Sequence, residues 1–245
     1  MIVIKSPEEI GLMRESGSIL SEMLQQLGGV VRPGIRTREL NEFVEAEMKR
    51  RGVVASFKGY GGYPASVCVS VNDEIVHGIP GSRTVKEGDI VSLDLGVYRK
   101  GFHTDAALTV AAGEPSLEAE RLVRVTEECL AKGIEAARPG NHIGDISAAI
   151  QRHIESQGFS IVREYTGHGV GRDLHEEPQI PNFVCGKGPL LRKGMALAIE
   201  PMVNMGGWKT RVAPDKWTVL TADGSLSAHF EHTIAVTDGD PEVLA

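Results

Sequence analysis

The apolar residues of this chain recur with a helical period in several stretches. The first stretch begins after Ser6, which is followed directly by Pro7 and, three positions after the serine, by Glu9. This order is typical of a helix start, because the serine can cap the first turn and the glutamate can complete a capping box. We expect the helix to end near Leu27, where the pair Gly28-Gly29 follows.

Three further helices are predicted. One begins near Ser116 and runs towards Ala137. The other two are amphipathic stretches, one after each Arg-Pro-Gly sequence, with apolar residues three and four positions apart. Their apolar positions are Leu40, Phe43, Val44 and Met48 in the first stretch, and Ile146, Ala149, Ile150 and Ile154 in the second.

Strand-like segments follow each pair of helices. They are short and rich in β-branched and aliphatic residues, as is typical of strands. The segments are Val67–Val71, Ile90–Tyr98, Leu197–Val203 and Thr233–Val236. Because the strands follow the helices and do not alternate with them, the pattern predicts a two-layer α+β fold with antiparallel sheets covered by helices.

The chain also repeats itself at an offset of 106 residues. Arg32-Pro33-Gly34 recurs as Arg138-Pro139-Gly140. Glu87–Asp94 aligns in the same way with Lys193–Glu200. Residues 1–245 are therefore predicted to form a single domain made of two pseudo-symmetric halves, about 1–110 and 111–245.

When the two halves of the sequence are aligned, acidic residues fall at equivalent positions. Asp94 corresponds to Glu200, and a second match, offset by 126, sets Asp105 against Glu231. A turn at Arg99-Lys100-Gly101 would bring Asp94 and Asp105 nearly opposite each other on one face of a hairpin. The second half carries the same hairpin with a longer loop, so Glu200 and Glu231 are expected to pair across it.

Four carboxylates in one low-dielectric cleft are costly unless a cation lies between them. Ser92 and Ala198 fall on the same strand faces as Asp94 and Glu200, and their small side chains would leave room for ions. His168 lies among glycines in Thr166–Gly171, where the backbone can come close to a ligand. We therefore expect His168 to join the four acids in a metal site.

The residue types limit which metal such a site can hold. Carboxylates with one imidazole suit cobalt, manganese, iron(II) or zinc in open, catalytic coordination. The imidazole of His168 disfavours calcium, because calcium prefers oxygen ligands. Four carboxylates are too many for one small ion, so two divalent metal ions per chain are predicted.

Composition narrows the class of protein. The net charge of −7 argues against nucleic acid as the main partner, because phosphate binding relies on Lys and Arg. The three cysteines are widely spaced and form no Cys-x-x-Cys pair, which indicates a reducing compartment. No apolar stretch has the length of a signal peptide core or of a bilayer span. A cytoplasmic protein without a membrane segment or a direct nucleic-acid site is expected.

The five predicted ligands together resemble the metal set of the methionine aminopeptidases. The surrounding sequences are similar to those of type I members over essentially the whole chain. These sequences are Gly59-Tyr60-Gly61-Gly62-Tyr63-Pro64, His77-Gly78-Ile79-Pro80, Gly101-Phe102-His103, His175-Glu176-Glu177-Pro178 and Ile199-Glu200-Pro201. The resemblance implies the pseudo-two-fold "pita-bread" fold of that family.

The resemblance also implies an activity. A dinuclear metallo-exopeptidase of this family is a hydrolase that removes the initiator methionine from nascent polypeptides whose second residue is small. Its partners would be the N-termini of nascent chains near the ribosome, and the enzyme is expected to be a monomer.

Roles for individual residues follow from the same resemblance. Glu200 resembles the base that takes a proton from water, His175 the donor to the substrate carbonyl, and His77 the residue that contacts the scissile amide nitrogen. Four positions match the lining of the methionine pocket, where polarisable and aromatic walls suit a thioether. They are Tyr60, Tyr63, Cys68 and Trp217.

Two positions depart from the family pattern. Leu174 stands where an aromatic residue is common, and Gly96 where a hydroxyl or small residue often supports the second metal. Two rival functions also remain open. One is a proline-specific peptidase of the aminopeptidase P or prolidase kind, which shares the fold but usually has an additional N-terminal domain. The other is a non-catalytic peptide-binding module, a class that loses metal ligands.

Overall fold

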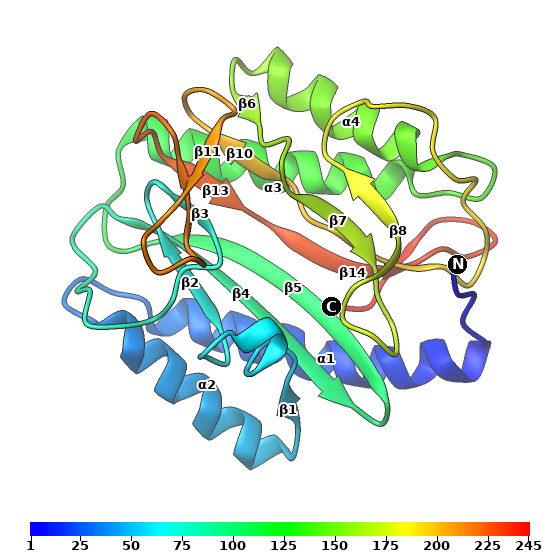
Figure 1. Cartoon of the computed structure of the whole chain (residues 1–245), viewed down its shortest axis with the longest axis horizontal. Coiled ribbons are helices and arrows are strands. Elements are labelled where there is room, and N and C mark those ends of the chain that lie inside the picture. Colours follow the sequence, from blue (N-terminus) through cyan, green and yellow to red (C-terminus); the bar gives the residue numbers. More distant parts are fainter.

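Four α-helices cover one face of a large antiparallel sheet in the computed structural model, which describes residues 1–245. Figure 1 shows the first two helices beside the long hairpin and the other two beside the later strands. The helices are α1 (Pro7–Val30), α2 (Thr37–Arg51), α3 (Leu117–Ala136) and α4 (Ile143–Ser156).

Fifteen strands form three sheets, and every pairing between them is antiparallel. The strands are β1 (Val54–Ala55), β2 (Cys68–Val71), β3 (Glu74–Val76), β4 (Ile90–Arg99), β5 (Phe102–Ala111), β6 (Ser160–Ile161), β7 (Thr166–Gly169), β8 (Glu176–Pro181), β9 (Ala196–Ile199), β10 (Met202–Asn204), β11 (Thr210–Val212), β12 (Val219–Thr221), β13 (Ser227–His229), β14 (Glu231–Ala235) and β15 (Glu242–Val243). The largest sheet has the order β1-β4-β5-β14-β9-β7-β8, with β2 added at β4 and β15 at β14. The two small sheets are β13-β10-β6 and β11-β12-β3.

The alternation of side chains along each strand separates a core face from a polar face. In β4 the odd-numbered residues, such as Leu93 and Leu95, join a core cluster with Leu20 of α1 and Leu40 of α2. In the other half, Leu197 of β9 joins a second core cluster with residues of α3 and α4. The even-numbered residues in the middle of β4 therefore face away from α1 and α2. Asp94 is one of them and lines the site cavity on this opposite face.

The helix starts agree with the sequence prediction. Ser6 caps α1, with its side chain accepting from the amide of Glu9 and the Glu9 carboxylate accepting from the amide of Ser6. Ser116 caps α3, with its side chain accepting from the amide of Ala119. The predicted end of α1 at Leu27 is wrong by three residues. The helix continues through Gly28 and Gly29 because Gly28 packs on the side chains of β5, which stabilise the last turn.

One predicted strand is divided. Leu197–Val203 breaks at Glu200-Pro201 into β9, in the large sheet, and β10, in a small sheet. Proline has no amide hydrogen to continue a ladder, so the strand changes sheets at that point. The break leaves Glu200 at the junction, on the site face.

The predicted hairpin between β4 and β5 is confirmed. Its loop is Lys100-Gly101, and both residues have positive φ, as a tight type I′ turn requires. The register pairs Asp94 with Ala107 and Asp105 with Gly96. The two aspartates are therefore diagonal neighbours on one face, two residues out of direct opposition.

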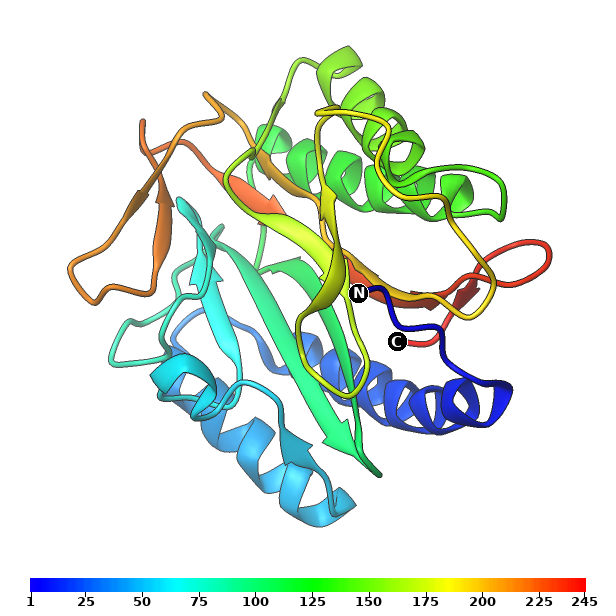
Figure 2. The same ribbon diagram turned by 45° about the vertical axis from the view of Figure 1, so that its right-hand side comes forward.

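The C-terminal end of the chain packs against α1 (Figure 2). Leu244 is buried in a cluster with Ile10 and Met13 of that helix. None of the helices combines the length and the apolar character needed to cross a membrane. The division into halves 1–110 and 111–245 stays a prediction from the repeat.

The packing of α1 allows a matched test with two glycines of the same helix. A methyl group at Gly17 would collide with the backbone carbonyl of Leu244, whereas one at Gly29 would meet no atom within 4 Å. Gly29→Ala should raise the free energy of unfolding by up to about 1 kcal/mol, because alanine favours the helix. Gly17→Ala gains the same propensity but should be net destabilising by about 1–3 kcal/mol. Urea denaturation followed by circular dichroism measures both, and a destabilising Gly29→Ala would contradict a helix that continues past Gly28.

Candidate metal centre and active site

All of the site residues predicted from the sequence line one cavity of about 170 Å³. A cavity of about 150 Å³ can hold a benzene molecule, so this one has room for a single side chain of similar size. The lining residues are Phe57, Tyr60, Tyr63, Cys68, His77, Asp94, Asp105, His168, Leu174, His175, Glu200, Trp217 and Glu231. No Lys or Arg is among them.

Strand register arranges the acids in two neighbouring rows across the sheet. In the first row, Cys68 pairs with Asp94, Asp94 with Ala107, and Ala107 with Glu231. In the second row, Asp105 lies opposite Gly96, and His168 lies opposite Ala198. Each acid or imidazole thus has a small residue beside it, and the space above those residues becomes the cavity.

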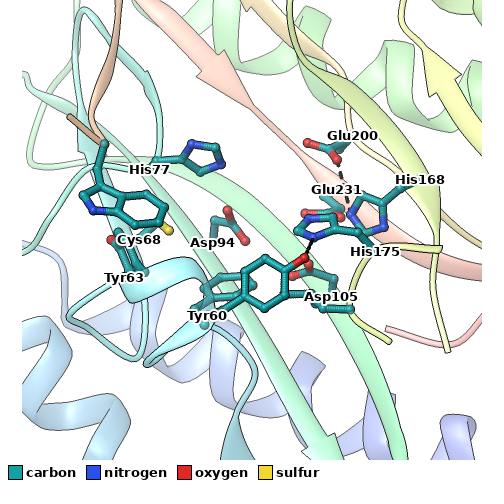
Figure 3. Close-up of a pocket in the computed structure, with 13 residues that line it drawn as sticks. Tyr60, Tyr63, Cys68, His77, Asp94, Asp105, His168, His175, Glu200 and Glu231 are labelled. Carbon is teal, nitrogen blue, oxygen red and sulfur yellow. Dashed lines mark hydrogen bonds and ion pairs between the residues drawn. The ribbon is translucent and has the colours of Figure 1, made fainter. Parts of the chain in front are cut away.

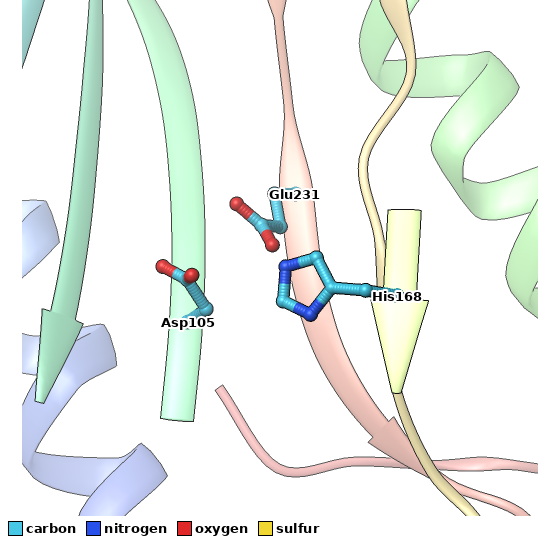
Figure 4. Close-up of side chains that lie close together, drawn as sticks. All are labelled: Asp105, His168 and Glu231. Carbon is cyan, nitrogen blue, oxygen red and sulfur yellow. The ribbon is translucent and has the colours of Figure 1, made fainter. Parts of the chain in front are cut away.

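Residues from three strands converge at the centre of the cavity. Ligand atoms of Asp105 (β5), His168 (β7) and Glu231 (β14) all lie within 4.8 Å of one another, and all three side chains are buried (Figure 4). Glu200 joins them, with its Oε1 3.5 Å from His168 Nε2. In Figure 3, Asp94 lies to the left of these four residues, on the side of Cys68.

The orientation of His168 is determined by its backbone neighbour. Its Nδ1 lies 2.8 Å from the carbonyl oxygen of Gly169 and donates to it. Burial lowers the pKa of His168 to about 3, so the ring is neutral and has only that one proton. Nε2 therefore presents a lone pair to the carboxylates, which is the tautomer a metal ligand needs.

The carboxylates are held in an environment that opposes their charge. Burial raises the pKa of Asp105 to about 7. Burial first, and then the charge of neighbouring acids, holds the pKa of Asp94, Glu200 and Glu231 well above the ordinary range. One oxygen each of Asp94, Asp105 and Glu231 is buried without a hydrogen-bond partner. These orphaned oxygens and the lone pair of His168 fit a divalent metal centre.

Two more histidines lie at the mouth of the carboxylate group. The ring of His175 lies 4.3 Å from that of His168, centroid to centroid. Burial lowers the pKa of His175, and it lowers the pKa of His77 to about 4, with the charge of His175 adding to the effect on His77. Both rings are therefore neutral near pH 7. His77 also has a positive φ of 61°, a backbone conformation that is uncommon for residues other than glycine.

Tyr60 has a second role that its sequence position did not suggest. Its hydroxyl lies 2.7 Å from Nδ1 of His175, and the two rings are 5.1 Å apart. Although expected only to line a pocket, Tyr60 is placed to determine which nitrogen of His175 carries the proton. With the phenol donating to Nδ1, the N–H of a neutral His175 is at Nε2.

The other end of the cavity is apolar. Figure 3 shows Cys68 and Tyr63 on the side away from Glu200 and His168. Tyr63 and Trp217 meet edge to face, 5.2 Å apart, and the Tyr63 hydroxyl donates to the carbonyl of Gly78 at 2.8 Å. Burial, and then the charge of Asp94, raises the pKa of the Cys68 thiol well above its usual value. Cys68 is therefore a neutral wall and not a thiolate nucleophile.

The two departures from the family pattern have structural explanations. Leu174 is buried and packs with Phe57, Tyr63 and Cys68, so an aliphatic wall stands where an aromatic one was expected. At Gly96 an added Cβ would lie 2.7 Å from that of Ser56 and 2.9 Å from the Phe57 ring. The neighbouring loop therefore fills the space that a side chain at residue 96 would need.

Sequence reasoning missed two residues of the site. Phe57 lines the cavity, but an isolated aromatic before the glycine-rich loop carries no signal of its own. His229 is buried, and its Nε2 lies 3.8 Å from Glu200 Oε2. The match that sets Asp105 against Glu231 also sets His103 against His229, and that coincidence is the signal that could have found it.

The chain matches known proteins over its whole length. Residues 11–238 match the model of metallopeptidase family M24. A methionine aminopeptidase of Clostridium perfringens is 53% identical over 245 residues, covering 100% of this chain and 98% of that protein. The crystal structure of methionine aminopeptidase from Thermotoga maritima superposes with a TM-score of 0.98 at 48% identity, covering 100% of this chain and 99% of that one.

A more distant structure shares the fold alone. Prolidase from Pyrococcus furiosus gives a TM-score of 0.81 at 22% identity, covering 99% of this chain but 65% of the prolidase. The predicted pita-bread fold, with helices over antiparallel sheets, is thus confirmed. By family model, identity and structure, the chain belongs to metallopeptidase family M24.

Proposed function

We propose that this chain is a type I methionine aminopeptidase, a cytoplasmic and monomeric hydrolase that acts on the N-termini of nascent polypeptides near the ribosome. One observation carries the proposal. A single cavity joins a buried group of carboxylates and one imidazole to an apolar pocket with room for one side chain. The names and high identity of the relatives support the same activity.

Five residues would hold two divalent metal ions: Asp94, Asp105, His168, Glu200 and Glu231. Their donor atoms suit cobalt, manganese, iron(II) or zinc. When bound, such ions polarise a carbonyl and lower the pKa of a water molecule towards neutrality. They would also offset the repulsion among the four carboxylates.

Three residues of the chain would move or stabilise charge during peptide hydrolysis. Glu200 would take the proton of the attacking water and pass it to the leaving amine. His175 would donate Nε2–H to the substrate carbonyl and stabilise the negative charge that develops there. His77, half-buried and neutral near His175, would contact the scissile amide nitrogen.

Specificity would come from the apolar end of the cavity. Tyr63, Cys68 and Trp217, with Leu174 and Phe57, form walls that are aromatic, aliphatic and sulfur-containing. A thioether is polarisable and apolar, so these walls suit a methionine side chain. The α-amine of the substrate would be the only positive group near the carboxylates apart from the metals. Because the carboxylates favour this positive charge, only a peptide with a free N-terminus would be accepted.

The two rival functions are disfavoured by particular features. Identity to the Pyrococcus furiosus prolidase is 22%, against 53% to the Clostridium perfringens methionine aminopeptidase. A non-catalytic module would not need to keep four buried ligand-type residues and a half-buried Glu200, whose uncompensated charge is a burden on folding.

Substrate assays separate these functions. We expect the metal-free protein to be inactive and to release methionine from Met-Ala-Ser as manganese, cobalt, iron(II) or zinc is titrated in. N-acetyl-Met-Ala-Ser should resist cleavage because its α-amine is blocked. Cleavage confined to Ala-Pro substrates would favour the proline-specific peptidase, and binding of peptides without turnover would favour the non-catalytic module.

Asp105→Asn should have opposite effects on stability with and without metal. In the metal-free protein it removes a buried carboxylate that is mostly ionised at pH 8, because its pKa is about 7, so the free energy of unfolding should rise by at least about 1 kcal/mol. Mn²⁺ affinity should fall by more than the roughly 10- to 100-fold expected for loss of an outer partner.

Calorimetric titration and urea denaturation measure the two effects. Asp238→Asn, at an exposed acid paired with Lys193, is the matched control and should change neither. Unaltered Mn²⁺ affinity in Asp105→Asn would remove Asp105 from the ligand set.

Removal of the His175 imidazole should lower kcat by about 100- to 1,000-fold, as is typical for a lost oxyanion donor. Tyr60→Phe keeps the aromatic wall but frees the His175 tautomer, so a smaller loss, about tenfold, is expected. Tyr98→Phe is the control, since Tyr98 stacks on His103 outside the cavity lining. Steady-state kinetics on Met-Ala-Ser measure all three. A Tyr60→Phe enzyme with normal kcat would show that the hydrogen bond between Tyr60 and His175 does not matter.

A further inference from the structure

His229 is the one buried imidazole near the cavity with no role in the proposed reaction. Its side chain is almost fully enclosed, and neither ring nitrogen has a hydrogen-bond partner. Unpaired polar groups in the interior are costly, so a buried ring with two of them calls for an explanation. The nearest charged group is the carboxylate of Glu200, whose Oε2 lies 3.8 Å from His229 Nε2.

The two oxygens of Glu200 face two different histidines. Oε1 lies 3.5 Å from Nε2 of His168, on the side of Asp105 and Glu231, and Oε2 faces His229. His168 presents a lone pair, because its Nδ1 proton is donated to Gly169. The Glu200 carboxylate therefore lies between two imidazoles. His168 can only accept a hydrogen bond at Nε2, whereas His229 can have its proton on either ring nitrogen.

His229 could donate a proton to Glu200 or ligate a metal together with Glu200 and Glu231, since the ligand atoms of all three lie within 4.8 Å. A metal-ligating histidine almost always donates its other N–H to an outer acceptor. His168 has such an acceptor, whereas Nδ1 of His229 has none. If His229 bound a metal through Nε2, the proton on Nδ1 would be buried without an acceptor. If Nε2–H donates to Glu200 instead, Nδ1 has only a lone pair without a donor, which costs less free energy.

The backbone of His229 is held firmly enough to aim its ring. The hydroxyl of Thr109 donates to the carbonyl of His229 at 2.8 Å and accepts from its amide at 2.9 Å. Ser92 lies 2.8 Å from the same hydroxyl and can supply a proton to it. On the other side, His229 pairs with Met202, directly after the Glu200-Pro201 break.

We propose that His229 is a positioning residue that directs its Nε2–H at Oε2 of Glu200, across the 3.8 Å that separate the two atoms, a gap that a small rotation of either side chain closes to a hydrogen bond. This interaction leaves Oε1 turned towards His168 and free for metal and water. This inference rests on the base role proposed for Glu200, because it explains how one oxygen of that carboxylate is kept for the reaction.

The test compares His229→Gln, which keeps an N–H donor of similar reach, with His229→Leu, which fills the space without one. His229→Leu should lower kcat on Met-Ala-Ser and Mn²⁺ affinity by about 10- to 100-fold, with KM nearly unchanged. His229→Gln should stay within about threefold of the wild type in both. His153→Leu, in α4 and outside the cavity lining, is the control for the substitution.

Pulsed electron paramagnetic resonance of the Mn²⁺-loaded protein separates donation from ligation. Coupling to directly bound nitrogen should be the same in the wild type and in His229→Gln, because only His168 supplies a nitrogen ligand. A changed coupling, or His229→Gln as impaired as His229→Leu, would overturn the proposal, and so would a fully active His229→Leu. If even the wild type released no methionine, the proposed function would fail, while Mn²⁺ affinities and nitrogen couplings would still decide the role of His229.

Discussion

The burial of four carboxylates on one face of a single sheet is the constraint on which the rest of this structure depends. Asp94, Asp105 and Glu231 are buried, and Glu200 is half-buried. Burial holds the pKa of each above its ordinary range, and the charge of neighbouring acids adds to this effect for all but Asp105. No Lys or Arg lines the cavity to offset them. Such an arrangement is tolerable only if the cores beneath it are stable and the charge is compensated from outside the chain. Two large apolar clusters, one under each pair of helices, supply that stability.

The register of the strands places these carboxylates close enough together to form one site. Because acids and small residues alternate across the rows, Asp94 and Asp105 meet diagonally and not in direct opposition. The strand break at Glu200-Pro201 then turns the fourth carboxylate towards the other three. A shift of one residue in either hairpin would send the acids into the helix-covered core. The tight turn at Lys100-Gly101 therefore matters to the site as much as the ligands themselves.

Much of this could be predicted from the sequence because the relevant signals are local or repeated. Capping residues locate the starts of α1 and α3, and the internal repeat aligns the four acids with one another. The end of α1 could not be predicted, since it depends on packing of Gly28 against β5. Phe57 and the contact between Tyr60 and His175 were also out of reach. They depend on which loops meet above the sheet, and the periodicity of a sequence carries no information about such meetings.

The protonation states around the cavity form a consistent pattern that follows from the lack of basic side chains in its lining. His168, His175 and His77 are neutral because burial lowers the pKa of each, and Cys68 keeps its proton because burial and Asp94 raise the pKa of its thiol. Positive charge must therefore arrive with the ligands, as metal ions or as the amine of a substrate. A lysine or arginine in the lining would compete with both for the same oxygens. The absence of basic side chains is thus as much a part of the chemistry as the carboxylates, because it keeps the site dependent on metal and selective for a free N-terminus.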